Sequence, residues 1–270
     1  MAIDHQADTT NTQPSTFRAT MHLRFKNLGN TCYINTILQC LRHQRHFVKT
    51  LRDVESNTLP HFVNLLYDDS TPQDLQQFIL YLMVKQIHNG YQGDAHEFFI
   101  KIIDLFYTTH KDIYNPFQGT FTTTLFCSCG FKTTNQEPFT CLSVTPKHNK
   151  SIQQMVHGIE EVEDVDMTCV CGRKLQKQTK ISTYPKSFVI HVKRFNNRNK
   201  KIKTNVTFDC FHNYRLRSLC NHLGSATNGH YTASVDNGRK GFYMCSDDTV
   251  VSIPKPTQSQ TCYMLFYERK

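Results

Sequence analysis

Residues 27–39 read Asn-Leu-Gly-Asn-Thr-Cys-Tyr-Ile-Asn-Thr-Ile-Leu-Gln, and they form the most informative stretch of the chain. A polar turn that contains a glycine leads into a segment whose apolar residues recur at helical spacing, namely Tyr33, Ile34, Ile37, Leu38 and Leu41. The spacing predicts an amphipathic helix that begins at Cys32. Asn30 or Thr31 is the expected N-terminal cap.

The position of Cys32 at the start of this helix suggests chemistry. A thiol there lies beside unpaired backbone N–H groups and the positive end of the helix dipole, and both favour the thiolate. The thiolate is the nucleophilic form of cysteine. Free cysteine is also among the most buried residue types. The local pattern therefore leaves two interpretations open, a nucleophile and a packed core thiol.

The composition describes a globular chain of moderate size. Its 270 residues, 39% of them hydrophobic, can build one large core or two small ones. No apolar run is long enough to cross a bilayer, so we expect no membrane partner. The first 22 residues are polar and lack the charged-then-apolar order of a signal peptide, so we expect a disordered lead-in over 1–22.

The cysteine content and the net charge bear on the compartment of the protein and on its partners. Eleven cysteines without a secretory signal indicate a reducing compartment, and we expect an intracellular protein of the cytoplasm or nucleus. The net charge of +9 permits contact with nucleic acid. Six of the eleven residues over 193–203 are basic, but they alternate with asparagine and lack a platform of aromatic side chains. We interpret them as a solvated hairpin tip and expect no nucleic-acid partner.

The first hundred residues or so are expected to be mainly helical. The sequence Thr-Pro-Gln-Asp at 71–74 predicts the start of a helix, and Asn-Gly at 89–90 predicts its end. Asp94 and Glu97 have the spacing of a capping box, which predicts a further helix after residue 94.

From residue 117 the pattern changes to short runs rich in β-branched and aromatic residues. These runs predict strands over 120–126, 187–193, 230–235, 241–244 and 262–267. A short helix is expected over 151–157 and an acidic loop over 160–166. A helical lobe over about 23–116 is thus followed by a strand-rich lobe, which is the α+β class.

A cysteine nucleophile needs a base and a group that orients the base. Of the 14 histidines, His230 follows Gly229 at the start of a predicted strand, and Asp247 and Asp248 come 17 and 18 residues later. A β-hairpin between them would bring a carboxylate beside the imidazole and hold it in one tautomer. The alternative is an ordinary surface histidine on a hairpin.

The blocks that surround these residues resemble the ubiquitin-specific proteases, a family of papain-like cysteine peptidases that remove ubiquitin. The similar blocks lie in the family's order: 27–39, Gln-Gly-Asp-Ala-His-Glu-Phe at 92–98, 185–195 ending in Lys-Arg-Phe, 221–231 ending in Gly-His-Tyr, 247–248 and 263–269. The match covers about residues 23–269. It implies one catalytic domain over 23–270, with a helical thumb to about residue 116, β-stranded fingers over about 117–184 and a β-rich palm over about 185–270.

The resemblance implies catalytic roles for five residues. Cys32 would be the nucleophile, and His230 the general base and then the general acid. Asp247 would orient His230, with the adjacent Asp248 as the alternative. Asn27 would donate its side-chain amide to the oxyanion together with the backbone N–H of Cys32, which is the kind of preorganised donor that stabilises developing charge. The alternative for Asn27 is a turn residue.

The resemblance also implies how substrate binds. Asp94 and Glu97 would face the basic, extended C-terminal tail of ubiquitin, although both residues can also cap a helix. His222 and Tyr231 would line a narrow channel that admits a Gly-Gly end because no side chains have to fit.

Two cysteine pairs predict a metal site. Cys127 and Cys129, and Cys169 and Cys171, are each followed by glycine, and four thiolates can form a tetrahedral zinc site. The family often carries such a site at the tip of its fingers, with two residues between the cysteines of each pair. Here one residue intervenes in both pairs, which tightens the chelate. Four free thiols are the alternative, and Cys141, His148 and His157 are weaker substitutes as ligands.

Two further departures from the family pattern concern packing. Gly93 replaces the second glutamine of its motif, and Tyr243 stands where tryptophan is usual. Neither change removes a group that bond cleavage needs.

The function that these features predict is that of a thiol-dependent deubiquitinase. It would act as a monomer on ubiquitin and ubiquitinated proteins, without a cofactor for catalysis and with a structural zinc ion. Three alternatives stay open: a non-catalytic ubiquitin-binding module with the same fold, a protease for another ubiquitin-like modifier, and a zinc-dependent nucleic-acid binder. Against the nucleic-acid binder, the sequence near the paired cysteines shows no recognised helix for reading bases.

Overall fold

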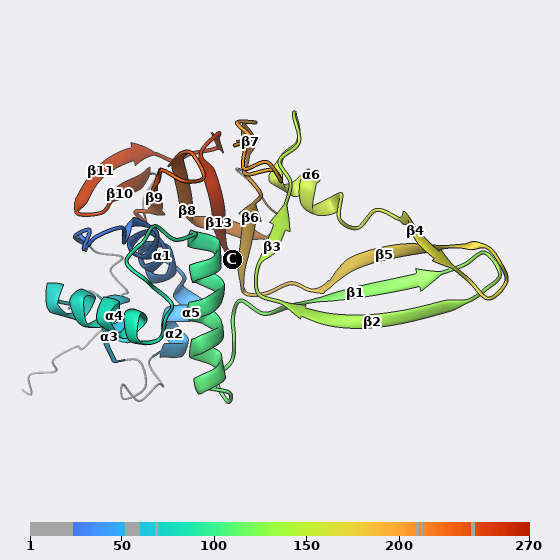
Figure 1. Ribbon diagram of the computed structural model, residues 1–270, viewed down its shortest axis with the longest axis horizontal. Helices are drawn as coiled ribbons and strands as arrows, with labels where there is room; N and C mark the ends of the chain where they lie inside the picture. The colour runs from blue at the N-terminus through green and yellow to red at the C-terminus, as the bar shows by residue number, and fades with distance from the viewer. Residues whose placement is uncertain (1–23, 52–59, 68–69, 209–210, 212, 239–240) are drawn as a thin grey trace, which may run out of the picture.

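The computed structural model describes residues 24–51, 60–67, 70–208, 211, 213–238 and 241–270, so the lead-in predicted over 1–22 lies outside the described residues. Along the chain, a helical part is followed by the strands of a long β-sheet arm and then by most strands of a central sheet, which confirms the α+β class (Figure 1). The helices are α1 (Cys32–Arg42), α2 (Arg45–Thr50), α3 (Pro60–Leu65), α4 (Pro72–Val84), α5 (Ala95–Thr109) and α6 (Ile152–His157).

The strands form two large sheets and a small one. The central seven-stranded sheet has the order β11-β10-β9-β8-β13-β6-β3, and the arm has the order β2-β1-β5-β4. The central strands are β3 (Leu142–Val144), β6 (Ser187–Val192), β8 (Tyr214–Gly224), β9 (Gly229–Asp236), β10 (Gly241–Ser246), β11 (Thr249–Pro254) and β13 (Cys262–Arg269). The arm strands are β1 (Gly119–Phe126), β2 (Lys132–Phe139), β4 (Glu163–Thr168) and β5 (Lys174–Thr183), and β7 (Val206–Thr207) pairs with β12 (Gln258–Ser259).

Helix α1 has an amphipathic sequence and is nevertheless buried on every side. All residues from Cys32 to Leu41 are buried, including the polar Asn35, Thr36 and Gln39. The helix packs against β8, β9 and β10 on one side and against α2 and α5 on the other, so no face of it is left for solvent. The expected amphipathic helix is present, but its polar side chains are buried as well, because a second packing layer that the sequence does not show covers them.

The helix boundaries follow local side-chain chemistry in part. The predicted start at Thr71 is confirmed, since Thr71 and Asp74 form a complete capping box. The predicted end at 89–90 is wrong, because α4 stops at Val84 and Gln86 adopts a positive φ of 56°. Thr31 is the N-terminal cap residue of α1, but no side chain caps the helix. The Thr31 hydroxyl instead accepts a hydrogen bond from the backbone N–H of Leu28 at 3.0 Å.

The arm extends away from the helices, to the right in Figure 1. Its strand β2 was not predicted, because seven of its eight residues are exposed and show no alternation of polar and apolar side chains. The acidic loop expected over 160–166 is wrong in its second half, where β4 pairs with β5. Strand β6, in contrast, is buried along its whole length and lies inside the central sheet, as its apolar run indicates.

A buried ion network joins the helices to the central sheet. The Arg217 side chain on β8 is 3% exposed, and its Nη1 lies 2.6 Å from Asp236 Oδ2 while its Nε lies 3.4 Å from Glu268 Oε2. The same Nε donates to the backbone carbonyl of His43 at 3.3 Å. Glu268 in turn accepts from the backbone N–H of His46 at 3.1 Å. The network thus holds the ends of α1 and α2 against β8 and β13.

Replacing Arg217 by methionine should lower the free energy of unfolding by about 3 kcal/mol, because it leaves two buried carboxylates without their shared cation. Arg215 provides a matched control, since it also contacts Asp236, at 2.8 Å, but is 46% exposed. Arg215→Met should cost less than about 1 kcal/mol. Urea denaturation measures both losses, and equal losses would contradict this account of the network.

Candidate active site

Cys32 opens into a cleft of about 340 Å³ between the helices and the central sheet. The cleft is lined by Cys32, Gln92, Gly93, Asp94, Phe195, Asn199, His222, Ala226, Gly229, Tyr231 and Tyr263. Asp94, His222 and Tyr231, which were predicted to contact substrate, are all in this lining. Glu97 is not in it. The Glu97 carboxylate pairs with Lys101 Nζ at 2.7 Å on the surface of α5.

The environment of the Cys32 thiol differs from the expectation for a helix start. Burial raises its pKa above the ordinary value, and the negative charge of Asp247 raises it further. A backbone hydrogen bond from Tyr231 acts in the opposite direction but is outweighed. The thiol therefore needs a base to become the nucleophile, and the helix terminus alone does not ionise it.

Asn27 organises the turn that precedes Cys32. Its Oδ1 accepts hydrogen bonds from the backbone N–H groups of Gly29, at 3.0 Å, and Thr31, at 3.2 Å. Its Nδ2 donates to Asp247 Oδ2 at 3.0 Å. The oxygen of the amide is thus engaged by the turn, and the NH2 group faces Asp247. Asn27 is therefore a turn residue, as the alternative interpretation expected, and its role as an oxyanion donor stays a prediction.

Asp247 lies on the two-residue turn between β10 and β11, with a positive φ of 49°. Aspartate tolerates this left-handed backbone better than most residues. Its Oδ1 accepts a hydrogen bond from Asn35 Nδ2 at 2.8 Å, in addition to the bond from Asn27. A carboxylate from the far end of the chain therefore lies against the first turn of α1.

His230 has a different partner from the one expected. Strands β9 and β10 form the predicted antiparallel hairpin. Within the described part of the chain, however, no hydrogen bond joins His230 to Asp247 or to the exposed Asp248. His230 Nε2 instead lies 2.9 Å from Ser246 Oγ. The turn conformation at Asp247 directs its carboxylate toward Asn27 and Asn35, and Ser246 is left beside the imidazole.

Gln92, Ser246 and Tyr263 are among the site residues that were not predicted from sequence. Gln92 Nε2 donates to the carbonyl of Gly229 at 2.9 Å, so its side chain spans the cleft. The Tyr263 hydroxyl donates to Asp94 Oδ2, whose Oδ1 caps α5 through the N–H of Glu97. The only sequence signal for Ser246 is its position next to Asp247. Gln92 and Tyr263 could have been identified as the first residues of the similar blocks 92–98 and 263–269.

The glycine at position 93 has a steric reason. A Cβ placed there would lie 2.6 Å from Cζ of the Tyr33 ring. Tyr33 follows the nucleophile candidate, and its hydroxyl lies 2.8 Å from His88 Nδ1. The wall of the cleft opposite β9 therefore rests on the Tyr33 ring, and a larger residue at position 93 would push the two apart.

The four paired cysteines converge at the far end of the arm. Their sulfur atoms all lie within 4.8 Å of one another, with Cys127 Sγ 3.6 Å from Cys171 Sγ and Cys129 Sγ 3.7 Å from Cys169 Sγ. Ideal tetrahedral coordination with Zn–S bonds of about 2.3 Å places sulfur atoms about 3.8 Å apart. The cluster could therefore hold a metal ion. Cys141, His148 and His157 are not part of it.

The shortened spacing of both pairs is matched by two turns with the same hydrogen bonds. The N–H of Gly130 donates to the carbonyl of Cys127, and the N–H of Gly172 to that of Cys169. Both glycines have positive φ, 97° and 83°. Each turn thereby brings the sulfurs of its pair to the same side, where the other pair meets them.

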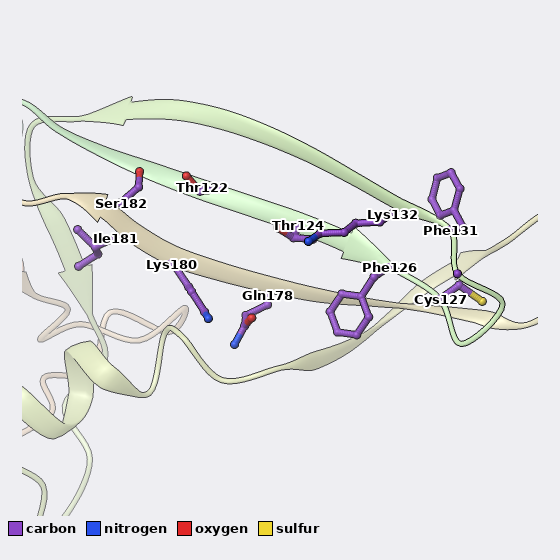
Figure 2. A pocket seen from close by; sticks show the side chains of 11 residues that line it. Thr122, Thr124, Phe126, Cys127, Phe131, Lys132, Gln178, Lys180, Ile181 and Ser182 are labelled. Atoms are coloured by element: carbon purple, nitrogen blue, oxygen red, sulfur yellow. The ribbon is translucent and has the colours of Figure 1, made fainter.

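A second cavity, of about 690 Å³, lies along the arm next to this cluster (Figure 2). It is lined by Thr122, Thr124, Phe126, Cys127, Gly130, Phe131, Lys132, Gln178, Lys180, Ile181 and Ser182. It shares no lining residue with the cleft at Cys32. The arm therefore offers a contact surface of its own, made of hydroxyl, amino and aromatic side chains.

The model of the family described as ubiquitin carboxyl-terminal hydrolase matches residues 23–267. Curated relatives include ubiquitin carboxyl-terminal hydrolase Usp2 of Drosophila melanogaster, 26% identical over 90% of this chain and 34% of its own length. Ubiquitin carboxyl-terminal hydrolase 23 of Arabidopsis thaliana is 26% identical over 90% of this chain and 35% of its own length. The chain thus spans about a third of the length of these relatives.

Solved structures share the fold. The SAGA Ubp8/Sgf11/Sus1/Sgf73 DUB module bound to ubiquitin aldehyde contains a chain with a TM-score of 0.78 and 22% identity, over 93% of this chain and 71% of that one. The Ubp8-Sgf11-Sgf73-Sus1 SAGA DUB module gives a TM-score of 0.73 at 22% identity, over 91% and 67%. These matches confirm the papain-like α+β architecture. Among the described residues, no helix is long and apolar enough to cross a membrane.

Replacing Asp247 by asparagine should lower the pKa of the Cys32 thiol, because it removes a negative charge that opposes the thiolate. Iodoacetamide should then alkylate Cys32 faster than in the unmodified protein at about pH 8, since the thiolate is the reacting form. Mass spectrometry of the peptide that contains Cys32, after timed quenching, measures the rate. Asp248→Asn is the control and should change nothing, because Asp248 is exposed. An unchanged or slower rate in Asp247→Asn would contradict the assignment.

Proposed function

The chain belongs to the ubiquitin carboxyl-terminal hydrolase family, and on this premise we propose that it is a thiol-dependent deubiquitinase. It hydrolyses the isopeptide or peptide bond at the C-terminal glycine of ubiquitin, and its partners are ubiquitin and ubiquitinated proteins. The observation that supports this proposal most strongly is the position of Cys32, at the buried start of α1 and in the wall of a cleft. One chain supplies the whole cleft, which suits a monomer.

In the proposed reaction, Cys32 loses its proton to His230 and its sulfur attacks the carbonyl carbon of the terminal glycine. The bond to the lysine nitrogen breaks, and the amine leaves with the proton from His230. Water then attacks the thioester, gives its proton to His230, and releases the glycine carboxylate and the free thiol. The raised pKa of Cys32 makes the base necessary for the first step.

The oxyanion formed during attack needs a fixed donor. We assign this role to the NH2 group of Asn27 and the backbone N–H of Cys32. Asp247 supports it, because its carboxylate holds the Asn27 amide and the Asn35 amide in place. Ser246 is the group in contact with the imidazole of His230, and Asp248, next to Asp247 on the same turn, is the alternative carboxylate.

The shape of the cleft suits a glycine-rich tail. Gly93 and Gly229 lie in its lining, and a Cβ at either position would collide with Tyr33 or with His222. Asp94 adds a negative charge that favours a basic segment. An extended backbone without side chains fits such a cleft better than an ordinary peptide does.

A ubiquitin that carries a thiol-reactive group in place of its C-terminal carboxylate should form a covalent adduct with the protein at Cys32. Cys32→Ala should abolish the adduct, because it removes the attacking sulfur. Denaturing electrophoresis and intact mass measurement report the product. Probes built on other ubiquitin-like modifiers, tested in parallel, show which modifier is preferred. No adduct with the unmodified protein, or an undiminished adduct with Cys32→Ala, would refute the proposal.

We further propose that the four-cysteine cluster binds a structural zinc ion that holds the end of the arm together. Cys127, Cys129, Cys169 and Cys171 supply the ligands, and the sulfur distances suit tetrahedral coordination. When bound, the ion would cross-link the two turns at the arm's end, where the apolar cluster is small. Free thiols in all described cysteines are consistent with the reducing compartment that such a site requires.

The purified protein should contain about one zinc ion per chain, measured by elemental analysis. Cys129→Ser should lose it, because three thiolates bind more weakly than four, and the melting temperature should fall. Cys141→Ser is the matched control, since Cys141 lies outside the cluster, and it should keep its zinc. A protein without zinc, or a Cys129→Ser variant with unchanged zinc content, would contradict the proposal.

A further inference from the structure

Lys201 makes three polar contacts at the edge of the cleft. Its Nζ lies 3.0 Å from His222 Nδ1, 2.6 Å from the backbone carbonyl oxygen of His222 and 3.1 Å from that of Gly224. All three acceptors lie at the end of β8, where the chain leaves the sheet before it returns as β9. A lysine from the segment interpreted as a solvated hairpin tip is thus anchored against the cleft.

The ammonium group of Lys201 determines which ring nitrogen of His222 carries the proton. An ammonium carries three donors and no acceptor, and the three contacts use all of them. His222 Nδ1 must therefore be the unprotonated nitrogen, and the proton of the neutral ring must be on Nε2. Burial, with Lys201 as the next cause, lowers the pKa of His222 to about 4, so the ring is neutral at ordinary pH.

The Nε2 edge of His222 lies against the backbone of the cleft wall. A Cβ at Gly229 would be only 2.1 Å from His222 Nε2, so the ring can occupy this position only because residue 229 is glycine. His222, Gly229 and Tyr231 all line the cleft. The ring is packed between Phe195, at 5.4 Å between centroids, and Tyr231, at 4.6 Å, which fixes its plane.

Other residues keep Lys201 in place. Lys201 pairs with Phe195 in an antiparallel bridge, so it sits at the closed end of the hairpin over 195–201. Arg194 is fully buried and donates to the backbone carbonyls of Ile202 and Thr204 on the far side of Lys201. The bridge to Phe195 and the Arg194 contacts that follow it hold the local backbone in place, and the Lys201 side chain contacts the end of β8.

We propose that Lys201 is a positioning residue that holds His222 as a neutral imidazole with its proton on Nε2, so that the cleft presents a fixed donor to the backbone of an extended, glycine-rich tail. The donor contacts a backbone carbonyl of the tail, away from the bond that breaks. The identity of the tail rests on the proposed deubiquitinase function. The tautomer of His222 does not depend on it.

Nitrogen-15 NMR of the histidine rings tests the first half of the proposal without substrate. At about pH 7, the unmodified protein should show Nδ1 of His222 unprotonated and Nε2 protonated, with the signals assigned by their loss in His222→Gln. Lys201→Met should give a mixture of tautomers, because the donor at Nδ1 is gone. A proton on Nδ1 in the unmodified protein would overturn the proposal, even if Lys201→Met failed to fold.

Steady-state kinetics with a fluorogenic ubiquitin amide test the second half. Lys201→Met should raise KM about tenfold and change kcat by less than about twofold, because a binding hydrogen bond is lost and the reacting atoms are untouched. Lys203→Met is the matched control, since it removes the same charge from the same segment at an exposed position, and it should leave KM unchanged.

The outcomes separate this proposal from the proposed function. If Lys201→Met is folded and its KM matches that of the Lys203→Met control, the positioning role is refuted. If it lowers kcat and leaves KM unchanged, the role as a binding donor is refuted as well. If the unmodified protein turns over no ubiquitin substrate, the deubiquitinase function fails, whereas the NMR result still decides the tautomer.

Discussion

The burial of α1 on all sides is the constraint on which the rest of the structure depends. A helix that packs against α2 and α5 on one side and against β8, β9 and β10 on the other cannot shift without opening the core. Its first residue, Cys32, is therefore fixed relative to the β9–β10 hairpin that carries His230. At the C-terminal end of α1, the ion network around Arg217 fixes the helix to the central sheet. The two parts of the site, from opposite ends of the chain, meet because α1 packs directly against β9 and β10.

Burial also determines the electrostatics of the site. It raises the pKa of Cys32 and lowers that of His222, because both environments disfavour a charged side chain. The charges that remain are held by specific partners: Asp247 by Asn27 and Asn35, and Lys201 by the end of β8. The cleft thus combines a neutral thiol at Cys32 and a neutral imidazole at His222 with charged side chains that are held by hydrogen bonds. In the proposed mechanism, deprotonation of Cys32 then depends on the position of His230.

Much of the architecture could be predicted from sequence, because it depends on local rules. The start of α4 at Thr71 and the buried run of β6 follow from capping and hydrophobic pattern. The exposed strand β2 could not be predicted, since a strand with solvent on its surface has no alternation to detect. The partners of Asp247 and His230 were also out of reach. The contacts of Asp247 join segments 220 and 212 residues apart. The contact between His230 and Ser246 depends on one left-handed turn residue, which no local pattern encodes.

The central claim is that Cys32 forms a covalent bond with the C-terminal glycine of its substrate. Rapid acid quenching during turnover of a ubiquitin amide, followed by intact mass measurement, tests it most directly. The account predicts a transient species with the mass of the protein plus ubiquitin less one water, located on the peptide that contains Cys32 and removed by hydroxylamine. Turnover without such a species, in experiments fast enough to detect it, or a bond to any other residue, would contradict the account.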